Sequence, residues 1–208
     1  MHIVSFIGQR GGQLKSTLSR LLATEAARSV SVRLADLDYN QGTSSDWSKR
    51  RAEAGLEPAV PTVLCRSIDE AFVGADGLDL LVIDCPGRAD QAMLEVAKRS
   101  TFIVQPTGAA LDDLLPSVRV FHTLIQHDIP ADRLGFVLTR ISTDAEAEAA
   151  REYLSATGYR VLPGYLYERA GYRAAQNSGR ALTEARYPSL RAAADTIAQT
   201  IIDAATAA

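Results

Sequence analysis

Cysteine, tryptophan and long apolar runs are scarce in this sequence of 208 residues, which has two cysteines and one tryptophan. Cys65 and Cys85 lie on or beside expected buried strands, are too few for a disulfide scaffold, and are expected to be reduced. No run approaches the roughly 18 apolar residues of a membrane span. The N-terminus has no basic region followed by an apolar stretch, so we expect no signal peptide and a cytoplasmic protein.

Basic residues are not in excess either, because the formal net charge is −3. The chain therefore lacks the global positive field of many nucleic-acid-binding proteins, although charge can still be concentrated locally. Hydrophobic residues make up 47% of the chain, as in an ordinary globular protein. No linker, internal repeat or low-complexity segment divides it, so we predict a single domain over residues 1–208.

Short apolar runs alternate with helical patterns along the chain. The expected strands are 2–7, 31–37, 61–65, 79–84, 101–105, 134–139 and 160–163, and the expected helices are 15–28, 43–54, 67–74, 89–98, 112–127, 145–157, 168–178 and 189–205. Continuously apolar strands separated by helices indicate a mostly parallel sheet covered on both faces. We therefore predict a doubly wound α/β fold, in which ligands bind outside the carboxyl ends of the strands.

A phosphate-binding loop is the clearest motif, because residues 8–17 read GQRGGQLKST directly after the first strand. In such a loop the backbone N–H groups and the helix N-terminus favour anionic oxygens. Lys15 would reach the β- and γ-phosphates, and the Ser16 hydroxyl would hold Mg²⁺. Gln9 and Leu14 stand where the usual spacing has glycines. The alternative is an ordinary strand-to-helix turn that contains Lys-Ser-Thr by chance.

Acidic residues end two of the expected buried strands. Asp36 and Asp38 end the second, and Asp84 ends the fourth, followed by Cys-Pro-Gly. A buried carboxylate is costly unless it has a use, and hydrated Mg²⁺ beside a triphosphate provides one. Asp84 fits the Walker B position. Gly87 lies where a loop could sense the γ-phosphate, and Asp36 or Asp38 could orient the attacking water. The alternative is that these aspartates cap the helices that follow.

Together these motifs resemble the ParA/MinD superfamily of deviant Walker A P-loop ATPases, and within it the small ParA-type plasmid partition proteins. Residues 10–17 align with the family loop, Asp36-Leu37-Asp38 with its Asp-x-Asp segment, and Asp84-Cys85-Pro86 with its Asp-x-Pro strand end. The segments 105–112 and 168–179 resemble the family's later elements, so the likeness spans the chain. It implies a three-layer α/β/α P-loop fold that binds ATP or ADP with Mg²⁺.

The resemblance also assigns roles to residues. It implies that the loop contacts the nucleotide. It also implies that Thr139-Arg140 lies against the adenine base, with residues 163–167 as the opposite wall of the adenine site. Further residues are implied to form a metal site and to catalyse ATP hydrolysis. The loop contacts are Gly11, Gly12, Gln13, Leu14, Lys15, Ser16 and Thr17, and the wall begins at Pro163. The metal-site residues are Ser16, Asp36 and Asp84. The catalytic residues are Lys15, Asp38, Asp36 and Arg10.

Two positions depart from the family loop. Arg10 replaces a lysine that, in this family, reaches across a dimer to the partner's phosphates; arginine keeps the charge but changes the reach. Leu14 replaces a glycine beside the phosphates, where a β-carbon restricts φ and backbone approach. We expect weakened binding, slow hydrolysis or a rearranged loop. The alternatives are therefore a partner-stimulated ATPase, a nucleotide switch or regulatory partner protein that hydrolyses poorly, and a small metabolic P-loop enzyme.

The resemblance implies a homodimer that forms on ATP binding, associates with non-specific DNA near the nucleoid, and meets a centromere-binding adaptor protein in DNA partition. Arginines concentrated near the C-terminus are candidates for the DNA surface, although a solvated helix face is the plainer interpretation. They are Arg160, Arg169, Arg173, Arg180 and Arg186, and Lys49-Arg50-Arg51 forms a second basic cluster. The alanine-rich tail at 190–205 has Leu190, Ile197 and Ile201 at helical spacing, which predicts packing on the sheet and no membrane binding.

Overall fold

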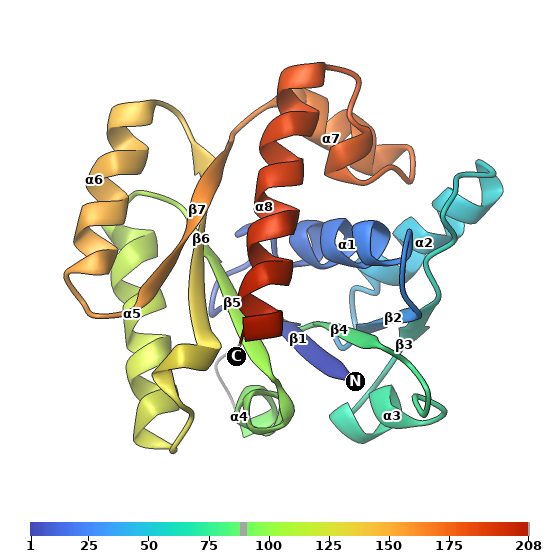
Figure 1. The fold of residues 1–208 in the computed structure, drawn as a ribbon, viewed down its shortest axis with the longest axis horizontal. Helices are drawn as coiled ribbons and strands as arrows, with labels where there is room; N and C mark the ends of the chain where they lie inside the picture. The colour runs from blue at the N-terminus through green and yellow to red at the C-terminus, as the bar shows by residue number, and fades with distance from the viewer. Residues whose placement is uncertain (88–90, 208) are drawn as a thin grey trace.

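A computed structural model describes residues 1–87 and 91–207, and it has seven strands and eight α-helices in the order that the sequence predicts (Figure 1). The strands are β1 (His2–Phe6), β2 (Val32–Asp36), β3 (Thr62–Leu64), β4 (Leu80–Asp84), β5 (Phe102–Thr107), β6 (Leu134–Ile141) and β7 (Arg160–Tyr167). The helices are α1 (Lys15–Ala26), α2 (Thr43–Glu53), α3 (Ile68–Phe72), α4 (Gln91–Arg99), α5 (Leu111–Gln126), α6 (Asp144–Ser155), α7 (Ala170–Asn177) and α8 (Pro188–Ala207). There are also two short 3-10 helices, η1 (Ala131–Arg133) and η2 (Leu182–Glu184). The predicted start of α4 at residue 89 lies outside the described residues.

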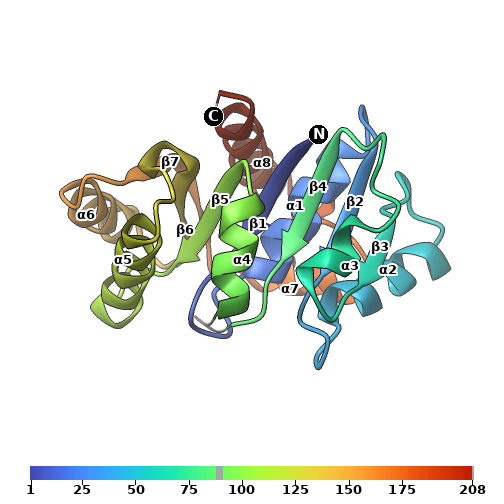
Figure 2. The ribbon, with the colours of Figure 1, turned by 90° about the horizontal axis from the view of Figure 1, so that it is seen from below.

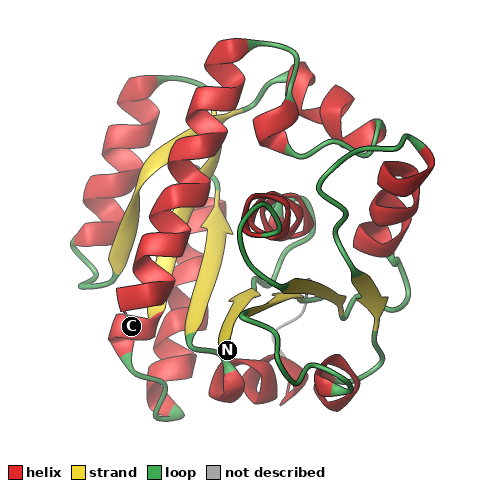
Figure 3. Ribbon diagram, turned by 45° about the vertical axis from the view of Figure 1, so that its right-hand side comes forward, coloured by secondary structure: helices red, strands yellow, loops and turns green. Residues whose placement is uncertain are grey.

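The strands form one sheet in the order β3-β2-β4-β1-β5-β6-β7, and every pairing is parallel. The sheet twists strongly from β3 to β7 (Figure 3). The doubly wound α/β prediction is therefore confirmed. The last strand was predicted too short, because β7 continues four residues past Pro163 to Tyr167. Proline is tolerated there because β7 is an edge strand, where a missing N–H interrupts no ladder.

Helices cover both faces of the sheet, which gives three layers (Figure 2). One buried cluster joins the sheet to α1, α2, α7 and α8, and a second joins it to α3, α4, α5 and α6. Leu190, Ile197 and Ile201 of α8 are buried in the first cluster, so the predicted packing of the tail on the sheet is confirmed. Among the described residues, none of the helices has the length and apolarity that crossing a membrane requires.

The carboxyl ends of three central strands are level with one another. Phe6 of β1 pairs in register with Asp84 of β4, and Asp84 in turn pairs with Asp36 of β2. The loop that follows β1 therefore opens directly beside both carboxylates. The parallel register of β1, β4 and β2 therefore brings the two sequence motifs together.

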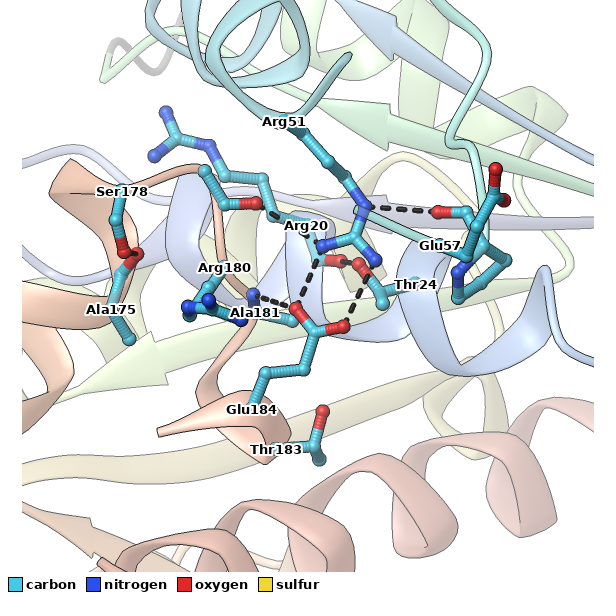
Figure 4. Close-up of polar contacts among 12 residues, drawn as sticks. Arg20, Thr24, Arg51, Glu57, Ala175, Ser178, Arg180, Ala181, Thr183 and Glu184 are labelled. Atoms are coloured by element: carbon cyan, nitrogen blue, oxygen red, sulfur yellow. Dashed lines mark hydrogen bonds and ion pairs between the residues drawn. The ribbon is translucent and has the colours of Figure 1, made fainter. Parts of the chain in front are cut away.

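A polar junction ties α2 to the turn between α7 and η2 (Figure 4). Arg51 is 1% exposed and donates to both carboxylate oxygens of Glu184, at 2.7 and 2.9 Å, and to the Gly179 carbonyl at 3.1 Å. Arg51 is thus a buried structural cation, so this member of the basic cluster Lys49-Arg50-Arg51 is not available to a partner. Burial raises the pKa of Glu184, but the Arg51 and Ala181 hydrogen bonds and the charges of Arg51 and Arg28 together outweigh burial, so the net pKa is lowered.

Gly179 fits this junction because it has no side chain. Its φ is 73°, and a Cβ built on it would lie 2.5 Å from Arg51 N. Gly55 has a similar φ of 61° but open space around the same position.

We expect Gly55→Ala to cost about 1 kcal/mol of unfolding free energy, the usual penalty of a left-handed non-glycine residue. Gly179→Ala should cost several kcal/mol more, since the helix backbone cannot move away cheaply. Urea unfolding of both variants measures the difference. Equal destabilisation of the two variants would show that the α2 backbone at Arg51 can move away from residue 179 at little cost.

Candidate phosphate-binding site

The loop between β1 and α1 lines a cavity of about 440 Å³ at the carboxyl edge of the sheet. All residues from Gly11 to Thr17 line it, together with Asp38 and the segment 85–87 after β4. A Cβ at Gly11 or Gly12 would meet no heavy atom within 4 Å, so the loop leaves open space above its backbone. Gly87 lies against the loop, with its Cβ position 3.2 Å from Gly11 N. The geometry is a cradle for a polyanion.

Leu14 occupies the left-handed conformation that a glycine would favour, with φ 65° and ψ 21°, immediately before α1. An L-residue pays roughly 1–2 kcal/mol for this conformation. Leu14 thus adopts a backbone conformation that glycine favours, and the expected effects on nucleotide binding, hydrolysis and the loop stay predictions. The leucine side chain is half-buried and lines the cavity.

Lys15 and Arg10 are both held by neighbouring protein groups. Lys15 Nζ donates to the Arg10 carbonyl at 3.0 Å, and burial lowers the pKa of its ammonium while Asp84 acts against that shift. Arg10 Nη1 donates to the carbonyl of Asp112 at 2.8 Å and to Asp113 Oδ1 at 3.2 Å, at the start of α5. The Arg10 side chain is 52% exposed. Gln13, by contrast, is buried beneath the loop with an unpartnered Oε1 among the described residues.

Asp84 is the carboxylate that faces the first turn of α1. Its Oδ2 accepts from Ser44 Oγ at 2.6 Å, while its buried Oδ1 has no hydrogen bond from any described residue. Burial raises the pKa of Asp84 to about 6, and the hydroxyls of Ser44 and Ser16 act in the opposite direction. A buried acceptor without a donor, beside the Ser16 hydroxyl, suits a hydrated cation.

Asp36, in contrast, is satisfied by backbone N–H groups. Its Oδ2 accepts from Ser44 N at 2.9 Å and Ser45 N at 3.0 Å, and its Oδ1 accepts from Asp38 N at 3.2 Å. These bonds cap the N-terminus of α2, which is the alternative that the sequence left open. Asp38 lines the cavity, and its carbonyl accepts from Gln41 and Gly42 in the turn that leads into α2.

The residues expected to surround adenine do not line this cavity. Thr139 is fully buried, and its hydroxyl donates to the Thr107 carbonyl at 3.4 Å. Arg140 has φ 57° and pairs with Glu168 at 3.0 Å. Pro163 lies inside β7 beside α8, where its carbonyl accepts from Thr200. Residues 163–167 belong to β7 and do not line this cavity, so an adenine wall formed by them stays a prediction.

The candidate DNA-binding arginines fall into two places. Arg160 begins β7 opposite Gly135, whereas Arg169, Arg173, Arg180 and Arg186 follow its carboxyl end. The strand separates these groups by about 23 Å, at roughly 3.3 Å per residue. All five arginines are exposed, but they cannot form one continuous patch.

Partners distinguish the four arginines beyond β7. Arg173 pairs with Glu168 at 3.0 Å, and the Arg169 guanidinium lies 4.7 Å from the Tyr167 ring centroid. Arg180 and Arg186 form no ion pair with a described residue, and both line a cavity of about 540 Å³ beside α7. No carboxylate among the described residues therefore neutralises their charges, and the Arg186 guanidinium lies 5.9 Å from the Tyr187 ring centroid.

Sequence reasoning missed three residues of the site. Thr43 places its hydroxyl 3.4 Å from Ser16 Oγ, and Ser44 joins Asp84 to Arg20 Nε, which lies 3.0 Å from Ser44 Oγ. Burial lowers the pKa of Arg20 to about 10, which leaves it charged at neutral pH. A polar residue inside a helical pattern normally faces solvent, so only the fold reveals that these side chains point inward.

A family model described as the CobQ/CobB/MinD/ParA nucleotide binding domain matches residues 4–182. The chain belongs to this family. The match includes the loop, both strand-end carboxylates and α7. No curated protein matches the sequence.

Solved structures similar to this family member have the same fold at low sequence identity. An apo McdA from Cyanthece has a TM-score of 0.74 at 16% identity, covering 97% of this chain and 99% of that one. MinD from Pyrococcus horikoshii, complexed with Mg-ADP, has a TM-score of 0.76 at 17% identity, covering 96% and 95%. A plasmid partition protein from Borrelia burgdorferi has a TM-score of 0.67 at 16% identity, covering 97% and 98%. These likenesses concern the fold.

The strain at Leu14 is measurable by comparing two truncations. Leu14→Gly and Leu14→Ala remove the same contacts, but only glycine relieves the left-handed conformation. We expect the glycine variant to be more stable than the alanine variant by about 1 kcal/mol in urea unfolding. The order is opposite to that in a helix interior, where alanine is the better residue. A more stable alanine variant would mean that the loop has a different backbone.

Proposed function

We propose that this protein is a ParA-type ATPase that binds ATP with Mg²⁺ and uses it as a dimerisation switch. The observation that carries the proposal is that Lys15 and Ser16 line one open cradle while the unpartnered Asp84 Oδ1 is buried beside Ser16. Because each group suits a different part of a magnesium–triphosphate, their combination is more specific than any one of them.

The residues present fit such a ligand. N–H groups of the loop and the start of α1 would hold the phosphates, and Lys15 would exchange its bond to the Arg10 carbonyl for phosphate oxygens. Ser16 would hold the metal, with Asp84 accepting from its water shell and Thr43 beside it. Mg²⁺ supplies charge neutralisation at the phosphates. Asp36 keeps α2 in place through its backbone bonds.

Asp38 is the residue that we assign to positioning the water for hydrolysis. It lines the cavity, and its side chain has no hydrogen bond from a described residue, so its carboxylate is available. Arg10 lies at the exposed rim, where the partner subunit's phosphates would be in a face-to-face dimer. The competing function, a nucleotide switch that hydrolyses poorly, rests on the half-buried Leu14 side chain in the cradle.

DNA is the partner that we propose for the arginine surface beyond β7, with partition or positioning of DNA as the setting and a DNA-bound adaptor as stimulator. Arg180 and Arg186 support it because their guanidinium groups have no carboxylate partner among the described residues. Phosphate contacts of this kind bind DNA without sequence preference. A dimer would present two such surfaces.

Removing the Lys15 charge tests the nucleotide site. We expect Lys15→Gln to weaken Mg-ATP binding by about 100-fold, which corresponds to a charge-assisted interaction worth about 3 kcal/mol. Lys49→Gln, at an exposed lysine of α2, is the matched control and should bind as the parent does. Calorimetry reports affinity, and light scattering reports whether ATP doubles the mass. Absence of binding in the parent at millimolar Mg-ATP would refute the proposal.

The separation of Arg160 from the arginines beyond β7 gives a test of the proposed DNA surface. We expect the pair Arg180→Gln and Arg186→Gln to weaken binding to a random duplex and to reduce its salt slope by about 2, or about 1 for each phosphate that is no longer neutralised. Arg160→Gln, at the opposite end of β7, should leave both unchanged. Fluorescence anisotropy at several salt concentrations in the presence of Mg-ATP measures both quantities. If Arg160→Gln weakens DNA binding more than the paired substitution does, the DNA surface lies elsewhere.

A further inference from the structure

Arg20 is a buried cation whose role the phosphate cradle alone does not explain. It lies in the second turn of α1, is 7% exposed, and also lines the phosphate cavity. Among the described residues it has no carboxylate within ion-pair distance. Its charge is compensated through space by Asp84 and Asp36. A buried charge held in this way responds to any change at those carboxylates.

A continuous series of hydrogen bonds passes through Arg20. At the cavity, Ser44 Oγ donates to Asp84 at 2.6 Å and accepts from Arg20 Nε at 3.0 Å. On the other side, Arg20 Nη1 donates to Gln176 Oε1 at 2.9 Å, and Gln176 Nε2 donates to the Arg180 carbonyl at 2.8 Å. The series begins at the metal side of the cavity and ends in the turn after α7.

The far end of the series is held by α2 as well. Trp47 Nε1 donates to the same Arg180 carbonyl at 3.2 Å, and Arg51 donates to the Gly179 carbonyl. Arg51 also donates to the Glu184 carboxylate (Figure 4). Asp36 caps the N-terminus of α2. The same helix therefore contacts the buried carboxylates at its N-terminus and the segment 178–184 through Trp47 and Arg51. Trp47 itself lies between the guanidinium groups of Arg20 and Arg51, at 5.9 and 5.6 Å from the ring centroid.

We propose that Arg20 is a positioning residue that links the metal side of the cradle to residues 178–184, so that Mg-ATP binding readjusts the turn that carries Arg180. The inference rests on the proposed nucleotide function. A cation near Asp84 competes with Arg20 for the same negative charge, so the bonds from Arg20 to Ser44 and Gln176 differ in energy between the two states. That difference is the coupling between the two ends. The exposed arginines beside α7 thereby acquire a geometry that depends on the nucleotide.

Two variants of the full chain test this proposal. Gln176→Ala removes the hydrogen bonds at the partly exposed end of the series, and Arg20→Lys keeps the charge but loses the planar guanidinium. Asn177→Ala, one position further on α7, is the matched control. Calorimetry measures the Mg-ATP affinity of each. Hydrogen exchange of amides 178–184, and emission of Trp47, the single tryptophan, report the response at the far end.

In the parent and in Asn177→Ala we expect Mg-ATP to change the exchange rates of these amides and the Trp47 emission. In Gln176→Ala that change in exchange should be roughly five-fold smaller or more, while the affinity stays within about ten-fold. A full response in Gln176→Ala would overturn the assignment, whatever Arg20→Lys does to stability. A parent that binds Mg-ATP without a change at 178–184 would overturn it too but leave the proposed function intact. A parent that does not bind at all would overturn both.

Discussion

Two carboxylates buried side by side at the ends of β2 and β4 are the constraint around which this edge of the protein is built. Both are fully buried, and the parallel register places Asp36 directly opposite Asp84. Burial of such charges is expensive unless hydrogen bonds and opposite charges compensate them. The N-terminus of α2 supplies N–H groups to Asp36, while Ser44, Arg20 and Lys15 surround Asp84. The position of α2 follows from this requirement, and Trp47 and Arg51 on that helix then fix the turn after α7.

The sequence predicts the parts of this arrangement that are local. The alternation of apolar strands with helices predicts the parallel sheet, and Asp84 at a strand end near a Lys-Ser-Thr helix start predicts the proposed metal site. Residues brought together only by tertiary packing escape such reasoning. Arg20, Thr43 and Gln176 lie on helices where polar residues are ordinary, so nothing in their spacing marks them as inward-facing. Asp36 fits both a metal site and a helix cap, and only its N–H donors distinguish the two.

The length of β7 shows a second limit. Proline and glycine at 163 and 164 are typical of a strand end, yet an edge strand accommodates both. Its outer carbonyls are occupied by Arg151 of α6, whose guanidinium donates to Leu162 at 3.0 Å and Gly164 at 2.9 Å. The extra strand length moves the carboxyl end of the sheet to Tyr167 and carries the arginines beyond it away from Arg160. A misjudged strand end thus changes which residues form one surface.

Leu14 and Arg10 affect the cradle in different ways. At Leu14 the backbone is dictated by its neighbours, because β1 and α1 are buried in the core and fix both ends of a short loop. The leucine therefore adopts a conformation that glycine favours, and any effect on the proposed nucleotide would come from strain and from a side chain in the cavity. Arg10 is tied to Asp113 by a half-exposed ion pair, which is worth about 0–1 kcal/mol. So weak a contact yields readily to a phosphate, which binds a guanidinium through two hydrogen bonds. In the proposed dimer, an arginine at this position would reach toward the partner subunit differently from a lysine.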